Sequence, residues 1–332
     1  MVNTPLKYLI SILLLSVFFA YCSKSGDSSD GHNLPVSNLS DLTNIQYGSN
    51  KDTSGKMISL TMDLYFPPEA TTARKFPLVM VMHGGSFLDG DKGDMKDDCA
   101  VLADSGFVVA SINYRLGWRA GTGQCNGDES SELQAGYRAI QDANAAMRFL
   151  VAHANTYGID TSWLFLAGSS AGSIMALNSV YIPENIAVAF LPAEFNLLGP
   201  VNNADNNLTN TFTIKGICNM WGALLDSNLI TASNALPTIS FHGTNDDVVP
   251  FNFGYNESCS NYIMLYGSEC IQRRLEFYNK PAISNFVIGG GHGPSVYTPE
   301  FLMGNTSCFF HRLIKGEPIT SKVYTTLVSS CN

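Results

Sequence analysis

Hydrophobic and polar residues alternate in two early stretches of the chain, and unbroken apolar runs follow further on. The alternating stretches, residues 44–47 and 58–66, predict a half-solvated pair of antiparallel strands. The unbroken runs are typical of strands that are covered on both faces, as in a parallel sheet. They lie at residues 78–82, 107–113, 163–167, 216–220, 238–242 and 285–288.

Helical periodicity fills several of the intervals between these runs. In residues 131–155 apolar side chains recur every three or four positions, and Ser131 and Gln134 are spaced as a capping box. Shorter helices are expected around residues 99–103 and 173–180. Strands that alternate with helices predict an α/β fold. Its mostly parallel central sheet is flanked by helices on both faces and preceded by an antiparallel hairpin.

The N-terminus has the pattern of a targeting segment. Lys7 precedes an apolar run from Leu9 to Ala20, which is short for a membrane span and typical of an export signal. Cys22 and a polar, acidic stretch follow, as in bacterial lipoprotein signals, in which that cysteine carries the lipid. Tyr21 departs from the small residue usual before such a cysteine, so an ordinary signal peptide is the alternative.

These features predict the domain organisation and the location of the protein. We expect a signal peptide at residues 1–21, a flexible tether at 22–33 and one α/β domain at 34–332. Within that domain, residues 181–215 are rich in Asn and Pro and are expected to form a small irregular cap over the site. The protein is expected to be exported, either as a membrane-anchored lipoprotein or as a secreted protein.

Composition narrows the classes of partner. The 332 residues carry a formal net charge of -9 and no basic run after the N-terminus, which argues against nucleic acid. A hydrophobic share of 45% and the lack of internal repeats fit a single domain with a large core. No cysteines have C-x-x-C spacing, and we expect no metal and no cofactor. The expected partner is a small-molecule substrate, with membrane contact only through the N-terminal anchor.

The eight cysteines are interpreted mainly as disulfides, because an exported protein folds in an oxidising compartment. Cys22 is set aside for lipidation, and Cys218, inside an apolar strand, is expected to be a buried thiol. Proximity along the chain then gives the pairs Cys99–Cys125, Cys259–Cys270 and Cys308–Cys331.

The strand at residues 163–167 ends in a G-S-S-A-G turn, residues 168–172, and a helix follows at once. Small residues around Ser170 suit a tight strand-to-helix turn that lifts the serine oxygen above the sheet edge. The same turn aims the N–H of Ala171 at that point. A serine hydroxyl is a poor nucleophile near neutral pH, so it needs a base and an acid that orients the base.

His292 is the strongest candidate for the base. It lies in a glycine-rich loop just past the last strand, where the chain can bend back over the sheet edge. His83 and His242 also end strands, but each is followed by Gly in a turn, where a histidine more often braces the loop by hydrogen bonding. The remaining histidines are interpreted as structural; they are His32, His153 and His311.

The acid should follow a strand that lies between the serine and the histidine in chain order. The turn after residues 238–242 offers two adjacent aspartates, of which at most one can meet His292. A solvated turn position fits Asp247, which favours Asp246, and Asp226 is a weaker third candidate. Paired glycines after residues 78–82 can bring backbone N–H groups close to a substrate oxygen, although a plain turn would look the same.

Five motifs, taken in order, resemble the α/β-hydrolase esterase/lipase family, close to its hormone-sensitive-lipase-like and type-B carboxylesterase members. They are V-M-H-G-G-S-F from residue 81, N-Y-R-L-G from 113, G-S-S-A-G from 168, H-G-T-N-D from 242 and G-H-G from 291. The resemblance spans residues 78–293. It implies an α/β-hydrolase fold with Ser170 as nucleophile, His292 as base and Asp246 as acid, the last from the H-G-T-x-D-x-x-V-P spacing.

The resemblance also implies an oxyanion hole made by the N–H groups of Gly85, Ser86 and Ala171. Ser86 stands where the H-G-G-G form of the motif has its third glycine, and little cost is expected because a backbone N–H does the work. The segment at residues 181–215 is too short to build the large lid of true lipases.

The first hypothesis is therefore an exported serine esterase that acts on small or carbohydrate-linked carboxylic esters. Phe87, Trp118, Arg119 and Trp221 lie near strand ends and could shape its pocket, although packing is the more common role. A prolyl-oligopeptidase-like serine peptidase is one alternative, disfavoured by the lack of propeller repeats. A non-catalytic surface binding protein on a hydrolase scaffold is another, disfavoured because every triad member is present.

Overall fold

A computed structural model of the chain describes residues 37–329. The predicted signal peptide, the tether and Cys22 lie outside the described residues. Within the described range no helix is both long enough and apolar enough to cross a membrane.

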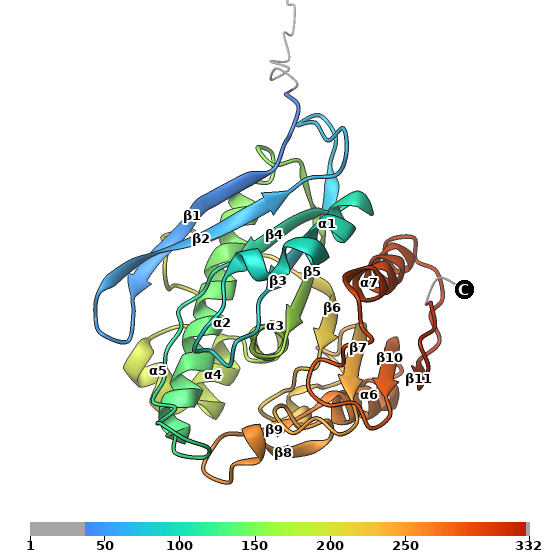
Figure 1. The fold of residues 1–332 in the computed structure, drawn as a ribbon. Coiled ribbons are helices and arrows are strands. Elements are labelled where there is room, and N and C mark those ends of the chain that lie inside the picture. The colour runs from blue at the N-terminus through green and yellow to red at the C-terminus, as the bar shows by residue number, and fades with distance from the viewer. Residues whose placement is uncertain (1–36, 330–332) are drawn as a thin grey trace, which may run out of the picture. The chain divides into compact units, whose positions relative to one another are not determined.

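The centre of the molecule is a nine-stranded sheet (Figure 1). Its strands are β1 (Leu42–Lys51), β2 (Met57–Tyr65), β3 (Phe76–Met82), β4 (Val108–Ile112), β5 (Ile159–Ser169), β6 (Ile214–Met220), β7 (Thr238–Gly243), β10 (Ala282–Val287) and β11 (Lys322–Tyr324). They are arranged in the order β1-β2-β4-β3-β5-β6-β7-β10-β11. The strands from β4 to β11 run parallel, whereas β2 is antiparallel to β1 and to β4. The predicted α/β class, with an antiparallel pair at its start, is confirmed.

Helices cover both faces of this sheet. They are α1 (Lys96–Asp104), α2 (Glu129–Ala152), α3 (Ala171–Tyr181), α4 (Glu184–Phe190), α5 (Pro192–Leu198), α6 (Ser268–Phe277) and α7 (Pro299–Ile314). Helices α2, α3 and α6 share one hydrophobic cluster with the sheet, and α1 and α7 share another. Along β3, Met80 enters the first cluster, while Val79 and Val81 enter the second. Burial on both faces explains why this strand is apolar at successive positions.

The short elements lie in the loops. They are the 3-10 turns η1 (Lys92–Met95), η2 (Ser227–Leu229) and η3 (Asn256–Ser258), and the two-stranded hairpin of β8 (Phe253–Tyr255) and β9 (Met264–Tyr266).

Asp128, rather than Ser131, caps helix α2. The Asp128 side chain accepts a hydrogen bond from the Ser131 N–H, which satisfies one of the free donors of the first turn. Gln134 bonds Ser130 instead of closing a capping box, so the predicted box is wrong. A carboxylate at this end also interacts favourably with the positive end of the helix dipole.

Residues 181–215 were predicted to be irregular, but they contain the two helices α4 and α5. The prediction is wrong for this part of the segment. Pro183 stands at the N-cap of α4, and Pro192 opens α5, where its missing N–H costs nothing. Ala187 and Leu191 are buried with Tyr137 of α2 in a third hydrophobic cluster. The apolar positions that make this contact are too few to reveal two short helices from their periodicity alone.

The rest of that segment is held to α2 and β1. The Asn206 amide donates to the carbonyls of Tyr47 and Ala145, at 3.0 Å each. This part is therefore a connection that packs along the sheet's first strand and its longest helix.

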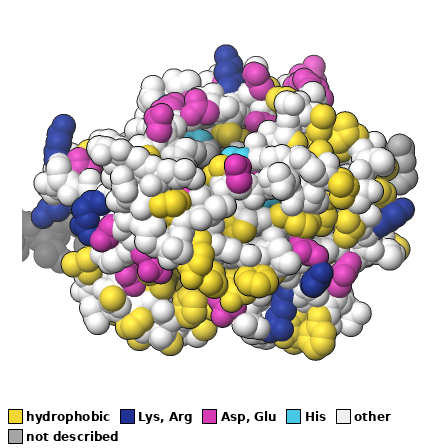
Figure 2. Space-filling model, turned by 60° about the horizontal axis from the view of Figure 1, so that its bottom comes forward, with side chains coloured by type: hydrophobic (Ala, Val, Ile, Leu, Met, Phe, Trp, Pro, Cys, Tyr) yellow, Lys and Arg dark blue, Asp and Glu magenta, His cyan; other side chains and the backbone are white. Residues whose placement is uncertain are grey.

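The lower edge of the sheet in Figure 1 is the one at which β5, β7 and β10 end. Figure 2 brings this side forward. Histidine side chains reach the surface near its centre among acidic and uncharged neighbours, while Lys and Arg lie toward the periphery.

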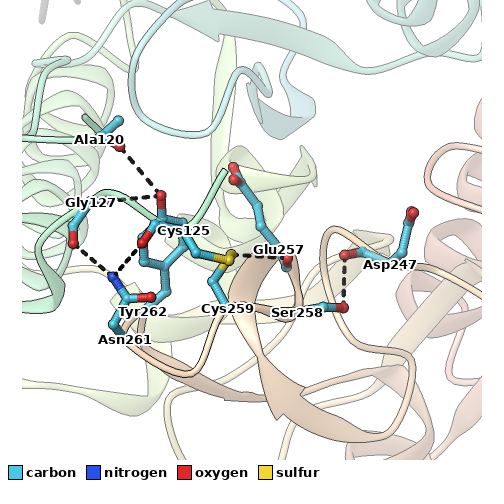
Figure 3. Close-up of a disulfide and its surroundings, with 9 residues drawn as sticks. All are labelled: Ala120, Cys125, Gly127, Asp247, Glu257, Ser258, Cys259, Asn261 and Tyr262. Carbon is cyan, nitrogen blue, oxygen red and sulfur yellow. Dashed lines mark hydrogen bonds between the residues drawn. A yellow bond between two sulfur atoms is a disulfide. The ribbon is translucent and has the colours of Figure 1, made fainter. Parts of the chain in front are cut away.

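One disulfide ties two loops that leave this edge. Cys125, between β4 and α2, is bonded to Cys259, between β8 and β9 (Figure 3). The predicted pairs Cys99–Cys125 and Cys259–Cys270 are therefore wrong. The true partners lie 134 residues apart, so nearness along the chain does not predict this pair.

The other cysteines divide between thiols and a second disulfide. Cys218 is a buried thiol, as predicted, and Cys99 and Cys270 are free as well. Cys308 is disulfide-bonded. Its predicted partner Cys331 lies outside the described residues.

Candidate active site

The turn between β5 and α3 holds Ser170 in a strained backbone conformation. Its φ of 54° and ψ of -121° lie outside the regions that non-glycine residues normally adopt. Gly168 and Gly172 make the turn possible. A Cβ on Gly172 would overlap the carbonyl oxygen of Met82, and one on Gly168 would overlap the carbonyl oxygen of Gly172. Only glycine fits these two positions, so the motif has a steric cause.

Ser170, His292 and Asp246 lie in one hydrogen-bonded line. Nε2 of His292 is 2.8 Å from Oγ of Ser170, and Nδ1 of the same ring is 2.8 Å from Oδ2 of Asp246. The three side chains come from the ends of β5, β10 and β7, so parallel strands bring together residues that are distant in sequence. With its proton on Nδ1, the imidazole leaves Nε2 as an acceptor that faces the serine hydroxyl.

Asp246, and not Asp247, meets the histidine. The Asp246 side chain is fully buried, whereas Asp247 is exposed. Oδ1 of Asp246 accepts hydrogen bonds from two N–H groups of its own turn, and Oδ2 faces both His292 and His242. Burial opposes ionisation, but the hydrogen bonds from His242 and His292 outweigh it and hold the pKa of Asp246 well below its usual range.

The other candidate acids and bases have structural contacts. The Asp226 side chain accepts from a backbone N–H in η2. Nitrogens of His153 and His311 bond backbone carbonyls. His83 stacks on Tyr114, and its Nδ1 lies 2.7 Å from the next carbonyl oxygen, so it braces the loop after β3, as predicted. Burial lowers the pKa of His83.

Unpaired backbone donors lie beside the nucleophile. A Cβ on Gly84 would be 3.3 Å from Cβ of Ser170, so the loop after β3 passes directly over the serine. Across the described residues, the N–H groups of Gly85, Ser86 and Ala171 donate to no protein acceptor. Gly85 and Ser86 have φ of 105° and 51°, a conformation that is costly for Ser and accepted by Gly. The arrangement offers donors for a negatively charged oxygen.

A cavity of about 410 Å³ opens next to these groups. Ser169, Gly85 and Trp221 line it, together with the carboxylates of Asp89, Asp94 and Asp98. The Trp221 ring meets the His292 ring edge to face, with centroids 6.4 Å apart. Burial raises the pKa of Asp98 to about 6.

A second, narrow apolar cavity of about 20 Å³ is lined by Phe87, Ile174 and Leu225, among others. Because Ile174 lies one helical turn after Ser170, this cavity runs behind the nucleophile. A larger cavity of about 640 Å³ lies between α2 and residues 202–214 and includes no residue of the triad. The two smaller cavities also include no triad residue, but each is lined by a residue close to Ser170 in the turn, Ser169 in one and Ile174 in the other.

Two other predicted pocket residues have bracing roles. Nε1 of Trp118 donates to the carbonyl of Ser86 at 2.8 Å, which anchors the loop with the free donors. The Trp118 ring in turn meets Tyr262 edge to face. Arg119 is exposed and pairs with Asp128.

Three buried polar residues lie behind Asp246; from the sequence, His242 was expected only to brace its loop, and the other two were missed. The three are His242, Ser268 and Asn219, which come from three different elements. The one signal in the sequence is that His242 and Asp246 are four residues apart; Asn219 and Ser268 carry none. Residues 37–329 contain no group of three or more His, Cys, Asp or Glu that could hold a metal ion.

The fold and the turn around Ser170 define an α/β-hydrolase: a mostly parallel sheet with a serine on a sharp strand-to-helix turn. Comparison with known proteins agrees with this class. Residues 62–226 match the family model described as BD-FAE. By this match the chain resembles the α/β-hydrolase esterases over that segment.

Individual relatives are distant. Carboxylesterase 3B of Mus musculus is 29% identical over 159 residues, which are 47% of this chain and 27% of that protein. Esterase LipI of Mycobacterium tuberculosis is 32% identical over 116 residues, which are 34% of this chain and 31% of that protein. The chain thus matches less than a third of the length of either relative.

Solved structures share the fold over a greater length. A truncated form of a carbohydrate esterase from gut microbiota superposes with a TM-score of 0.57 at 17% identity. The match covers 84% of this chain and 97% of that one.

Proposed function

We propose that the protein is a serine esterase that hydrolyses small or carbohydrate-linked carboxylic esters. The observation that carries this proposal is the unbroken line of hydrogen bonds from Ser170 through His292 to the ionised Asp246. Unpaired N–H groups stand beside the same serine, where an ester carbonyl oxygen would lie. These are the parts that acyl transfer needs.

In the first half-reaction, Oγ of Ser170 attacks the ester carbonyl carbon while Nε2 of His292 takes the hydroxyl proton. Asp246 accepts a hydrogen bond from Nδ1 and stabilises the positive imidazolium. The carbonyl oxygen becomes an oxyanion, which the N–H groups of Gly85, Ser86 and Ala171 stabilise. When the tetrahedral intermediate collapses, the alcohol leaves with the proton from His292, and the acyl group stays on Ser170.

In the second half-reaction, His292 removes a proton from water, and the resulting nucleophile attacks the acyl carbon. A second oxyanion forms in the same place. Its collapse breaks the bond to Ser170 Oγ, which recovers its proton from His292. The carboxylic acid is released, and the site returns to its starting state.

The two cavities suggest where the acyl group and the alcohol group of an ester would each bind. The narrow apolar cavity lined by Phe87 and Ile174 has room for about one water-sized group, which would suit the methyl of an acetyl ester. The cavity of about 410 Å³ beside Trp221 has an aromatic wall and carboxylates that can accept hydrogen bonds from hydroxyl groups. A hydroxyl-rich alcohol such as a sugar fits that chemistry.

Active-site labelling tests the reaction. The purified protein would be incubated with a fluorophosphonate, and the adduct located by peptide mass spectrometry. We expect labelling at Ser170 and rapid hydrolysis of p-nitrophenyl acetate, and Ser170→Ala should lose both while keeping its circular dichroism spectrum. Ser179→Ala, in the same helix but outside the site, is the matched control. Full activity in Ser170→Ala would exclude this mechanism.

The substrate class needs its own test. Trp221→Ala should raise KM for acetylated sugars about tenfold while changing KM for p-nitrophenyl acetate little, because a small phenol does not need the aromatic wall. Equal effects on both substrates would argue against a carbohydrate-linked ester.

The export proposal rests on residues 1–33, with Cys22 as the lipid acceptor. Expressed with its own N-terminus in a bacterium, the protein should enter the membrane fraction and incorporate labelled palmitate. Cys22→Ala should remove the label. A cytoplasmic, unlabelled wild type would contradict the proposal.

A further inference from the structure

His242 is buried directly behind the proposed acid. Its exposed fraction is 0%, and Nε2 lies 3.1 Å from Oδ2 of Asp246, the same oxygen that faces His292. Nε2 also lies 3.1 Å from the carbonyl oxygen of Val249. Two imidazoles thus share one carboxylate oxygen, and the mechanism above uses only one of them.

The hydrogen bonds around His242 fix which ring nitrogen carries the proton. The N–H of Gly222 can only donate, and it meets Oδ1 of Asn219 at 2.9 Å, which sets the orientation of that amide. Nδ2 of Asn219 therefore donates to Oγ of Ser268 at 2.9 Å. The Ser268 hydroxyl then has its own proton left for Nδ1 of His242, 2.7 Å away.

The direction of this chain makes Nδ1 of His242 an acceptor, so its proton lies on Nε2, where Asp246 and a backbone carbonyl are both acceptors. Every polar side-chain atom of Asn219, Ser268, His242 and Asp246 has a partner. Loss of the Nε2 proton would leave Asp246 and the Val249 carbonyl without this donor. The hydrogen bonds therefore place the proton on Nε2.

We propose that His242 is a positioning residue that acts through Asp246: its Nε2–H fixes the carboxylate and withdraws part of its charge from His292. The proposal rests on the esterase mechanism above. A second donor on Oδ2 weakens the attraction between Asp246 and a protonated His292, so it favours the neutral, base-competent form of His292. The titratable groups that face this carboxylate are His242 and His292.

A histidine that only filled space would not have this electrostatic effect. Removing the second donor should strengthen the pull of Asp246 on a protonated His292, so the base would be blocked by protonation up to a higher pH. The acid limb of the pH profile of kcat/KM should then move upward. A loss of shape alone would lower kcat/KM by the same factor at every pH.

Two variants separate these cases. His242→Leu keeps an apolar side chain of similar bulk and removes the donor, while the amide of His242→Gln can place an N–H near the position of Nε2. We expect the acid limb of His242→Leu to rise by about half to one pH unit. Its loss of kcat/KM should therefore be several-fold greater at pH 6 than at pH 8.5. His242→Gln should restore the wild-type limb at least in part.

The matched control is His153→Leu, which removes a histidine bonded only to a helix carbonyl and should leave the profile unchanged. An equal loss at all pH values in His242→Leu, or an acid limb that moves downward, would refute the proposal.

A measurement without substrate keeps the proposal separate from the esterase mechanism. In ¹⁵N NMR of the wild type, His242 should show a proton on Nε2. A neutral ring with its proton on Nδ1 would overturn the assignment even if the protein is an esterase. If the wild type were inactive but gave the expected NMR signals, the proposed function would be refuted and the hydrogen-bond arrangement would still be supported.

Discussion

The glycines on either side of Ser170 are sterically required by the turn that holds the nucleophile. Gly168 and Gly172 lie where a Cβ would collide with backbone carbonyls, which cannot rotate away as a side chain could. Gly172→Ala should therefore force the strand-to-helix turn open and displace Ser170. We expect a loss of at least about 2 kcal/mol in the free energy of unfolding and loss of fluorophosphonate labelling.

The control lies in another helix. Gly304 of α7 has no atom within 4 Å of an added Cβ and no positive φ. Gly304→Ala should raise the free energy of unfolding by about 0.5–1 kcal/mol, because Ala is the better helix former. Urea denaturation of both variants gives the comparison, and a stable, labelled Gly172→Ala would show that the turn tolerates a methyl group.

The sequence predicted the three aligned residues because each is marked by local chemistry. Ser170 stands in a turn that needs small neighbours, His292 in a glycine-rich loop, and Asp246 at a fixed spacing after a strand. The polar residues behind them are different. Asn219 and Ser268 belong to β6 and α6, and nothing near them in sequence says that folding brings them against His242. Contacts made across the sheet leave no local pattern.

At the level of elements, long apolar runs were predictable and short or polar elements were not. The parallel strands were visible because burial on both faces makes them apolar at most positions. Strands of three residues, such as β8, β9 and β11, are too short to establish an alternating pattern, and α4, α5 and α6 gave no clear signal either. Cysteine pairing failed for a related reason. Nearness along the chain says little about two loops that meet only at a shared sheet edge.

The Cys125–Cys259 disulfide lies between two parts of the site, the loop with the free N–H groups and the turn with Asp246. Beside it, Tyr262 packs on Trp118, which donates to Ser86 of the loop with the free N–H groups. On the other side, the N–H of Glu257 donates to the carbonyl of Val248, just after the acid. Figure 3 shows the link from Ser258 to the carbonyl of Asp247 as well. One covalent bond thus fastens both the acid turn and the donor loop.

Removing this bond should weaken the fold and the site together. The double variant Cys125→Ser/Cys259→Ser should lose about 2–4 kcal/mol in the free energy of unfolding, since a 134-residue span is no longer closed in the unfolded chain. Its kcat for p-nitrophenyl acetate should fall more than its KM changes, because the donor loop and the acid turn are less well held.

Cys270→Ser is the control for that experiment, since it changes a free thiol that bonds Asn252. It should match the wild type in thermal unfolding and in kcat. If the double variant also matched the wild type, the disulfide would contribute nothing to either property.

At the scale of the whole molecule, buried carboxylates set how stability depends on pH. They act in opposite directions. The depressed pKa of Asp246 gives stability that is present above its unfolded value and is lost in strong acid. Burial instead raises the pKa of Glu132 to about 7. Burial and the neighbouring Asp142 carboxylate also raise the pKa of Asp205, despite the Arg115 guanidinium 3.3 Å away. Groups of this second kind oppose folding when they ionise.

Glu132 permits a clean test, because it is 1% exposed and joins α2 to the loop around Ile263, whose N–H lies 3.0 Å from its carboxylate. Its folded pKa is higher than its unfolded value, so the folded state binds more protons, and stability falls as pH rises through the window from about 4.5 to about 7. The full shift corresponds to about 3 kcal/mol.

Glu132→Gln cannot ionise, so its free energy of unfolding should decline less than that of the wild type between pH 5 and pH 8. Urea denaturation at pH 5 and at pH 8 measures the difference, and Glu129→Gln, at an exposed position in the same helical turn, should keep the wild-type slope. A Glu132→Gln slope equal to that of the wild type would mean that Glu132 ionises as readily in the fold as in the unfolded chain, with its bonds to Asn256 and Ile263 compensating for burial.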